Sequence, residues 1–174
     1  MIKPSEIIQF LHNDLAYEQK LVSLINTKGE QIPLSSFSEL YSTEDVTIKL
    51  EGMEKFNQAL FNKCEQLKSE YTHNGPVTCH VFIAKIGSPS FGLHTDPDDV
   101  LIYCVEGKKT LTVNGEYIVL CEGEEVFIPA DTPHIAHNEY AALTLSFGLE
   151  KFLIDKAIKY ELDIIPKDDG NLQP

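Results

Sequence analysis

The second half of the chain consists of short apolar or alternating segments that end at Gly, Asn, Asp or Pro. Between residues 76 and 150 these segments are VTCHVFIAKI, VLIYCVEG, KTLTVNG, EYIVLCEG, EEVFIPAD and AALTLSFG. Runs of this length bounded by turn residues are typical of β-strands. Val113-Asn114-Gly115-Glu116 has the Asn-Gly pair of a tight hairpin. Many short strands joined by short turns predict a closed antiparallel sandwich or jelly roll.

The first 75 residues have a different pattern, and we expect a mostly helical cover there. PSEIIQFL, from Pro4, reads as the capped start of an amphipathic helix. Residues 52–71 place apolar side chains at helical spacing. Between these helices, VTIKL (46–50) predicts a short edge strand. A final amphipathic helix, KFLIDKAIKYEL (151–162), is expected to cover one sheet.

Length indicates a single domain, because 174 residues is an ordinary domain size. We divide it into a mostly helical N-terminal cover (1–75), a β core (76–150), and a C-terminal helix with a polar tail (151–174). We find no internal repeat and no low-complexity linker.

Charge and hydropathy restrict the partners. With 14 basic and 27 acidic residues the formal net charge is −13. We therefore expect no nucleic-acid partner, and any macromolecular target should be neutral or basic. MIKPSEIIQF has no long apolar run, so no secretory signal is expected. No stretch approaches the ~20 apolar residues of a membrane span. These features favour a cytoplasmic protein without a membrane partner.

The four cysteines form no CxxC pair and lie inside apolar segments; they are Cys64, Cys79, Cys104 and Cys121. We interpret them as buried free thiols in a reducing compartment. The sequence leaves a disulfide open.

Two histidines and an aspartate are candidate metal ligands. His94 and Asp96 lie in HTDPDD, and His134 follows His94 by forty positions in IPADTPH. Two imidazoles and one carboxylate on facing strands can occupy one triangular face of an octahedral metal. Non-heme Fe(II) oxygenases use this arrangement, which leaves three positions open. A structural zinc site would close all four positions, usually with thiolates.

The segment GEEVFIPADTPHIAHN (123–138) resembles the second motif of the cupin family, G-x5-P-x-G-x2-H-x3-N. The matching positions are Gly123, Pro129, His134 and Asn138. Asp131 replaces the usual glycine, and Asp tolerates turn conformations better than most residues. His137 follows His134 by three positions, so on a regular strand the two point to opposite faces. We expect only His134 to enter the barrel.

The segment GLHTDPDDVLIYCVEGKKTLTV (92–113) resembles the JmjC-type branch of the cupins. That branch includes ribosomal-protein and asparaginyl hydroxylases that use Fe(II) and 2-oxoglutarate. Its H-x-D motif matches His94 and Asp96. Metal-storing and sugar-modifying cupins use H-x-H and then a Glu ligand. At that position this chain has Val100 or Leu101, which cannot ligate a metal.

The resemblance also implies a role for Lys109. The branch places a basic anchor fifteen residues after the first ligand histidine, which is the position of Lys109. There it would pair with the far carboxylate of 2-oxoglutarate, because burying a dianion without a partner is costly. We expect Lys108 to point the other way. The alternative for Lys109 is an exposed hairpin lysine.

Other residues near these motifs receive weaker assignments. ALTLSFGLEKF is similar to the last strand of the ribosomal oxygenase branch, and Thr144 and Ser146 share one face of it. Their hydroxyls are predicted to help bind 2-oxoglutarate. Tyr103 is expected to fill the core. Asp98 and Asp99 are expected to hold the turn after Asp96, with binding of a cationic substrate at the barrel mouth as the alternative.

The predicted fold is mainly β, a double-stranded β-helix (cupin or jelly roll) with helical covers. The resemblance implies an Fe(II)- and 2-oxoglutarate-dependent hydroxylase in which His94, Asp96 and His134 hold iron and are catalytic. Its substrate would be an amino-acid, peptide or protein side chain, or a small metabolite. One alternative is a metal-dependent cupin without 2-oxoglutarate, such as a dioxygenase or isomerase. Another is a non-catalytic ligand-binding or sensor cupin. The oligomeric state stays open, with a homodimer among the options.

Overall fold

The computed structural model describes residues 2–151. Residues 152–162 of the predicted C-terminal helix, and the polar tail, lie outside the described residues. The helices are α1 (Pro4–Leu11), α2 (Asp14–Glu18) and α3 (Gln58–Glu70), with short 3-10 helices at Phe37–Ser42 and Met53–Lys55. The strands are β1 (Val22–Ile25), β2 (Gln31–Pro33), β3 (Thr47–Leu50), β4 (Val77–Ala84), β5 (Asp99–Val113), β6 (Glu116–Cys121), β7 (Glu125–Ile128), β8 (His134–His137) and β9 (Ala142–Leu149).

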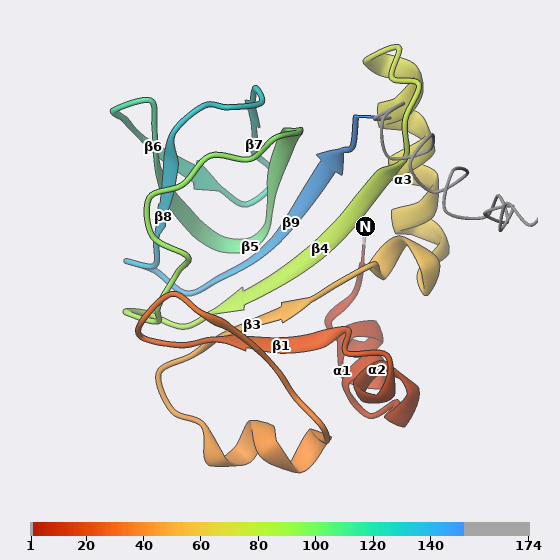
Figure 1. Cartoon of the computed structure of the whole chain (residues 1–174), viewed down its shortest axis with the longest axis vertical. Coiled ribbons are helices and arrows are strands. Elements are labelled where there is room, and N and C mark those ends of the chain that lie inside the picture. Colours follow the sequence, from red (N-terminus) through yellow and green to blue (C-terminus); the bar gives the residue numbers. More distant parts are fainter. Residues whose placement is uncertain (1, 152–174) are drawn as a thin grey trace, which may run out of the picture.

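The strands form two facing antiparallel layers that share β5. The larger layer runs β2-β1-β3-β4-β9-β5, with β7 on the far side of the first part of β5. The smaller layer pairs the second part of β5 with β6 and β8. In Figure 1 β5 curls so that the smaller layer folds back over β4 and β9. The mainly β jelly-roll prediction is therefore confirmed.

The long strand β5 is the corner between the layers. The segments 100–107 and 109–115, which the sequence analysis separates, are one continuous strand with an irregular register between Cys104 and Glu106. Gly107 lies just beyond with φ of +80°, and an added Cβ there would collide with the carbonyl oxygen of Ala141. A bulge and a glycine bend the strand without ending it. The glycine therefore looks like the end of a strand in the sequence, although the backbone only bends there.

The N-terminal region corrects the prediction of a mostly helical cover. It contains three helices, but β1, β2 and β3 extend the larger layer. VTIKL does form a strand, yet β3 is internal, because it pairs with both β1 and β4. All four residues of β1 are buried, so its sequence lacks the alternation that identifies a half-exposed strand.

The main core lies between the larger layer and the helices, on the side away from β8. Buried side chains from both sides form one cluster, including Ile7, Phe10, Leu50, Leu60, Leu67, Val81, Leu145 and Phe147. Figure 1 shows α1, α2 and α3 beside this layer, away from the smaller one. The helices therefore cover one face of the layer and leave the other face for the inside of the barrel. None of the helices among residues 2–151 combines the length and apolar character needed to cross a membrane.

Two local predictions have different outcomes. Asn114 and Gly115 both have positive φ, 48° and 83°, so the hairpin between β5 and β6 forms as predicted. Cys64, Cys79 and Cys104 are buried free thiols, but Cys121 is exposed. Cys121 ends the edge strand β6, where Leu120 takes the buried position and Cys121 alternates outward.

Candidate metal centre and cavity

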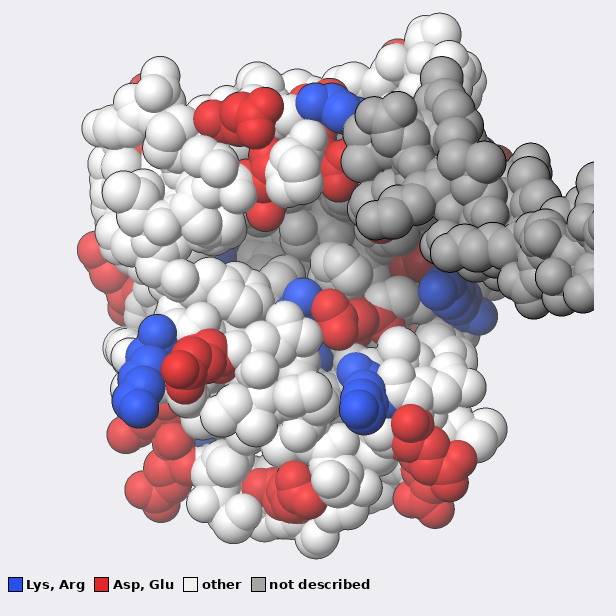
Figure 2. Space-filling view, viewed as in Figure 1, with Lys and Arg blue, Asp and Glu red and all other residues white. Residues whose placement is uncertain are grey.

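A cavity of about 530 Å³ lies between the two layers. Figure 2 shows this face of the molecule hollowed, with acidic side chains above the opening and both basic and acidic ones below. One wall consists of β8, the second part of β5 and the segment 88–96, and we call it the metal-side wall. The opposite wall contains β4 and β9, which we call the β4–β9 floor; its inward residues include Thr78, His80, Thr144 and Ser146.

Backbone pairing brings the two candidate histidines together. The amide of His94 donates to the carbonyl of His134 (3.1 Å), and the reverse bond is 2.9 Å. This antiparallel bridge places both imidazoles on the same side, with ring centroids 4.3 Å apart. Nε2 of His134 lies 3.4 Å, and Nε2 of His94 4.0 Å, from Oδ2 of Asp96. One ligand atom from each residue thus lies within 4.8 Å of the others.

The orientation of each imidazole suits a metal. Nδ1 of His94 donates to the carbonyl of Gly92 (2.8 Å), and Nδ1 of His134 donates to that of Thr132 (2.9 Å). A carbonyl can only accept, so Nδ1 carries the proton and the neutral ring presents the lone pair of Nε2. Metal-binding histidines are held in this way.

A proton and a metal ion would compete for Nε2 of His134. A proton on Nε2 of His134 bonds to Asp96, which raises the pKa of His134 and lowers the pKa of Asp96. Burial acts against both shifts. A metal ion would take the place of that proton. The three residues fit a divalent metal with open positions, because no fourth His, Cys, Asp or Glu ligand joins them among the described residues.

Backbone bonds hold the loops that carry the triad. The amide of Asp131 donates to the carbonyl of Asp96 (2.8 Å), and Asp131 has φ of 60°. The left-handed conformation explains why glycine is usual at this motif position. Asp99 accepts from the amide of Ala130 (2.8 Å), and Asp98 accepts from that of Lys151 (2.8 Å). Asp99 holds the turn as expected, whereas Asp98 joins its loop to the segment after β9 and also lines the cavity.

The histidine excluded by strand alternation points away from the cavity. Nε2 of His137 lies 2.8 Å from the hydroxyl of Thr112, and its ring lies beside Tyr117. His137 does not line the cavity, whereas His134 does.

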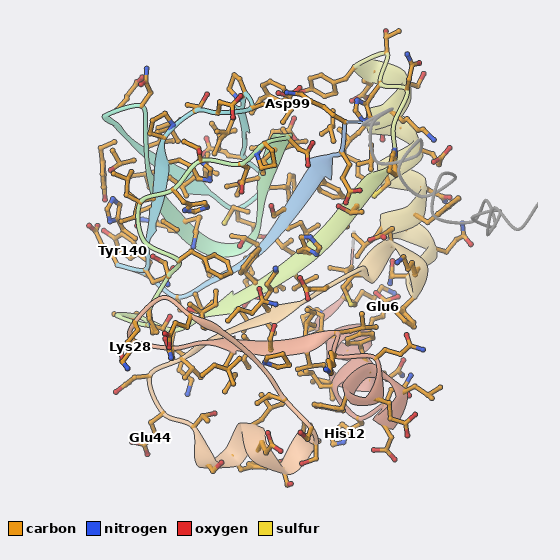
Figure 3. The ribbon with its side chains drawn as sticks, viewed as in Figure 1. Glu6, His12, Lys28, Glu44, Asp99 and Tyr140 are labelled. Atoms are coloured by element: carbon orange, nitrogen blue, oxygen red, sulfur yellow. The ribbon has the colours of Figure 1, made fainter. Side chains whose placement is uncertain are left out.

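Lys109 is a buried cation inside the cavity. It is 7% exposed, and its Nζ donates to Oδ1 of Asn138 (2.8 Å). The Asn138 amide in turn donates to the carbonyl of Ser88 (2.8 Å). Burial lowers the pKa of Lys109 to about 8, and no carboxylate among the described residues pairs with it. Lys108 points outward over the ring of Tyr140, which Figure 3 labels at the edge of the barrel. A buried ammonium with only an amide partner suits an anionic ligand.

The hydroxyls of Thr144 and Ser146 line the same cavity from β9. Neither side chain hydrogen-bonds another described residue, so both hydroxyls are available to a ligand. Tyr103 packs into the core cluster on the other face of β5, as predicted.

Lys49 and His80 also line the cavity, and neither is predicted as a site residue from the sequence. Lys49 is bound by Glu51 (2.7 Å) and by Oε1 of Gln31 (3.1 Å), and its Nζ lies 5.6 Å from the centre of the Phe91 ring. Strand alternation puts each side chain on one face of its strand, but the sequence does not show which face looks into the barrel.

Residues 80–147 match the family described as Cupin domain. This stretch is similar to cupin domains. It contains the whole triad and Lys109, and it begins at His80 on β4. No characterised protein matches the chain by sequence.

Solved structures extend the similarity beyond the cupin domain. YcfD, a ribosomal oxygenase from Escherichia coli, superposes with a TM-score of 0.66 at 14% identity, covering 99% of this chain and 52% of that one. The structure of YcfD with cobalt and 2-oxoglutarate gives a TM-score of 0.64 at 16% identity, covering 99% and 53%. The chain thus spans about half the length of that protein. At this identity the likeness establishes the fold, including the N-terminal strands and helices.

Proposed function

We propose that this cupin protein is an oxygenase that uses Fe(II) and 2-oxoglutarate to hydroxylate an amino-acid, peptide or protein side chain, or a small metabolite. The observation that carries the proposal is one cavity that holds both a His-Asp-His triad and a buried lysine without a carboxylate partner. YcfD, whose fold is similar, has been solved with cobalt and 2-oxoglutarate, which supports the same pairing of metal and cosubstrate here.

His94, Asp96 and His134 would hold the metal, which when bound supplies oxygen activation. Nitrogen and oxygen ligands with open positions favour iron over structural zinc. The carbonyls of Gly92 and Thr132 keep the two imidazoles turned toward the metal position.

Lys109 would bind the far carboxylate of 2-oxoglutarate. Asn138 fixes the position of its ammonium group, so little side-chain freedom is lost on binding. The bound anion would restore the pKa of Lys109 toward its ordinary value, since an opposite charge favours the protonated form. Thr144 is 2% exposed and faces the same space, where its hydroxyl can bond a carboxylate oxygen. Val100, Ile102 and Leu111 supply apolar lining to the same cavity.

The proposal is tested by oxygen uptake of the Fe(II)-loaded protein with and without 2-oxoglutarate, together with succinate release. We expect oxygen uptake to depend on 2-oxoglutarate and succinate to form. Oxygen uptake that is indifferent to 2-oxoglutarate would indicate a cupin dioxygenase of another kind. Metal binding with neither uptake nor succinate, over a broad set of amino acids and peptides, would indicate a binding or sensor protein.

A further inference from the structure

His80 is a polar side chain of the cavity that neither the metal triad nor the 2-oxoglutarate anchor uses. It lies on β4, in the register position opposite Ser146 of β9. Its imidazole lines the cavity from the β4–β9 floor, whereas the triad and Lys109 belong to the metal-side wall. A molecule held by His80 would therefore face the metal.

The ring nitrogens of His80 have no protein partner in the described part of the chain. Nδ1 is buried and unbonded, and among the described residues it is the one buried side-chain nitrogen or oxygen in this condition. Nε2 also bonds none of these residues, and we assign it to the cavity that the His80 side chain lines. The described part of the protein therefore satisfies neither ring nitrogen of His80, and because a neutral imidazole carries one donor, that donor is available to a bound molecule.

The protonation state of His80 indicates a donor at the cavity. Burial, followed by the charge of Lys49, lowers the pKa of His80 to about 4, although Glu51 acts in the opposite direction. The neutral ring carries one proton. Orphaned buried donors are rarer than orphaned acceptors, so the proton belongs on Nε2 and the bare lone pair on Nδ1. The ammonium of Lys49 near the ring is paired with Glu51 (2.7 Å), so the hydrogen-bond donor of the neutral ring, and not a net charge, defines the group that His80 can bind.

We propose that His80 determines specificity for the primary substrate by donating a hydrogen bond from Nε2 to a carbonyl or carboxylate oxygen of that substrate. The inference rests on the proposed function, because it assumes that a second molecule joins 2-oxoglutarate in the cavity. Ser146, beside His80, supplies a hydroxyl to the same oxygen or its neighbour.

Two variants and a matched control test whether His80 serves binding or folding. His80→Phe keeps a ring of similar size but removes both nitrogens, and His80→Asn restores a donor. His12→Phe makes the same change on an exposed residue after α1, which Figure 3 shows far from the barrel. We expect His80→Phe to unfold at the same or a higher temperature than the wild type, because it removes an unsatisfied buried atom. Affinities for Mn(II) and 2-oxoglutarate should be unchanged in all variants.

Small probes test the acceptor class. Acetamide, acetate and methylammonium are titrated into protein that holds Zn(II) and 2-oxoglutarate, and binding is followed by the ring ¹⁵N signals of His80 and the backbone amide of Ser146. We expect acetamide or acetate to saturate both signals. In His80→Phe the Ser146 signal should show roughly threefold to tenfold weaker binding, the effect of one lost neutral hydrogen bond, and His80→Asn should recover part of it.

The probes separate the remaining outcomes. Binding of acetamide but not acetate would indicate a neutral carbonyl group in the substrate. Binding of acetate but not acetamide would indicate a carboxylate. Equal probe affinity in wild type and His80→Phe, or methylammonium binding at His80 in place of both carbonyl probes, would overturn the proposal. If the wild type binds neither Mn(II) nor 2-oxoglutarate, the proposed function fails. Probe binding at His80 can then still be measured in the protein alone.

Discussion

The two walls of the cavity treat their polar groups differently. On the metal-side wall three inward polar side chains are already held by residues outside the triad: His94 and His134 by backbone carbonyls, and Lys109 by Asn138. On the β4–β9 floor His80 and Ser146 face the cavity without a bond to any described residue. The first wall is fixed before any ligand arrives, whereas the second has hydrogen-bonding capacity left over.

This difference is what a two-substrate site requires. Metal and cosubstrate chemistry depends on fixed geometry, so its residues are positioned by bonds to neighbours. A substrate supplies its own hydrogen-bonding groups, and a wall that leaves donors free can recognise them. The five predictions below test the contrast, from the largest expected effect to the smallest.

Loss of a triad residue should remove the metal. We expect His134→Ala, and equally Asp96→Ala or His94→Ala, to lose stoichiometric Mn(II) binding in metal analysis, because each removes one of three ligands. His137→Ala is the matched control, since it removes a histidine that points outward three residues away. A metal-free His137→Ala protein beside a metal-loaded His134→Ala protein would reverse the assignment of the two faces.

Gly107→Ala should destabilise the protein at the bend of β5, the strand that both layers share. The new Cβ would overlap the carbonyl of Ala141 in addition to requiring φ of +80°. We expect a loss of about 3 kcal/mol or more in the free energy of unfolding in urea. Gly115→Ala has a similar φ of +83° but nothing within 4 Å of its Cβ, so it measures the backbone strain alone. Equal losses in the two variants would show that close packing at Gly107 is unimportant.

Lys109→Ala should weaken 2-oxoglutarate binding to the Mn(II) protein roughly ten- to a hundredfold, the loss of a charge-assisted contact of about 1.5–3 kcal/mol. Lys108→Ala should change the affinity little, because its ammonium lies outside over Tyr140. Calorimetric titration measures both. An unchanged affinity in Lys109→Ala would move the anchor to the hydroxyl of Thr144, or to that of Ser146, which would then be lost to the primary substrate.

The affinity for 2-oxoglutarate should fall as pH rises above about 8, the pKa of Lys109 without the anion. Below that pH Lys109 is charged and affinity is steady; above it each pH unit costs about tenfold, or ~1.4 kcal/mol. Lys109→Arg stays charged, so its profile should be flat over this range.

The stability of the ligand-free protein should change with pH in the opposite direction to the affinity. The pKa of Lys109 is lower in the folded than in the unfolded protein, so between about pH 8 and the ordinary lysine pKa the unfolded state binds more protons. The free energy of unfolding should therefore rise with pH over that range. A falling stability there would contradict burial of the cation.

Asp131→Gly should have the smallest effect. Glycine adopts the φ of 60° without strain but loses more conformational entropy on folding, so the two terms nearly offset. We expect a change in unfolding free energy below about 1 kcal/mol and unchanged Mn(II) affinity, because the amide bond to the carbonyl of Asp96 is kept. A marked loss of metal would show that the Asp131 carboxylate, and not its backbone, supports the triad.

The metal-side wall was the part that local sequence predicted well. His94, Asp96 and His134 lie beside turns and at fixed spacings, and alternation on β8 decides between His134 and His137. These signals are local, so they survive without knowledge of the fold. The β4–β9 floor was harder, because a histidine in VTCHVFIAKI looks like any strand residue until its neighbours are known.

By itself the sequence determined the β-rich core, the Asn-Gly hairpin, the helix at Pro4 and the residues of the triad, because each depends on spacing and turn chemistry over a few positions. The tertiary structure decided the rest. It showed that β1 and β3 join the larger layer, that β5 bends at Gly107 without ending, that Cys121 faces outward, and that Lys49 and His80 look into the cavity. These outcomes depend on which strand pairs with which and on which face another layer covers. Residues far apart in the chain set both, so no local pattern contains them.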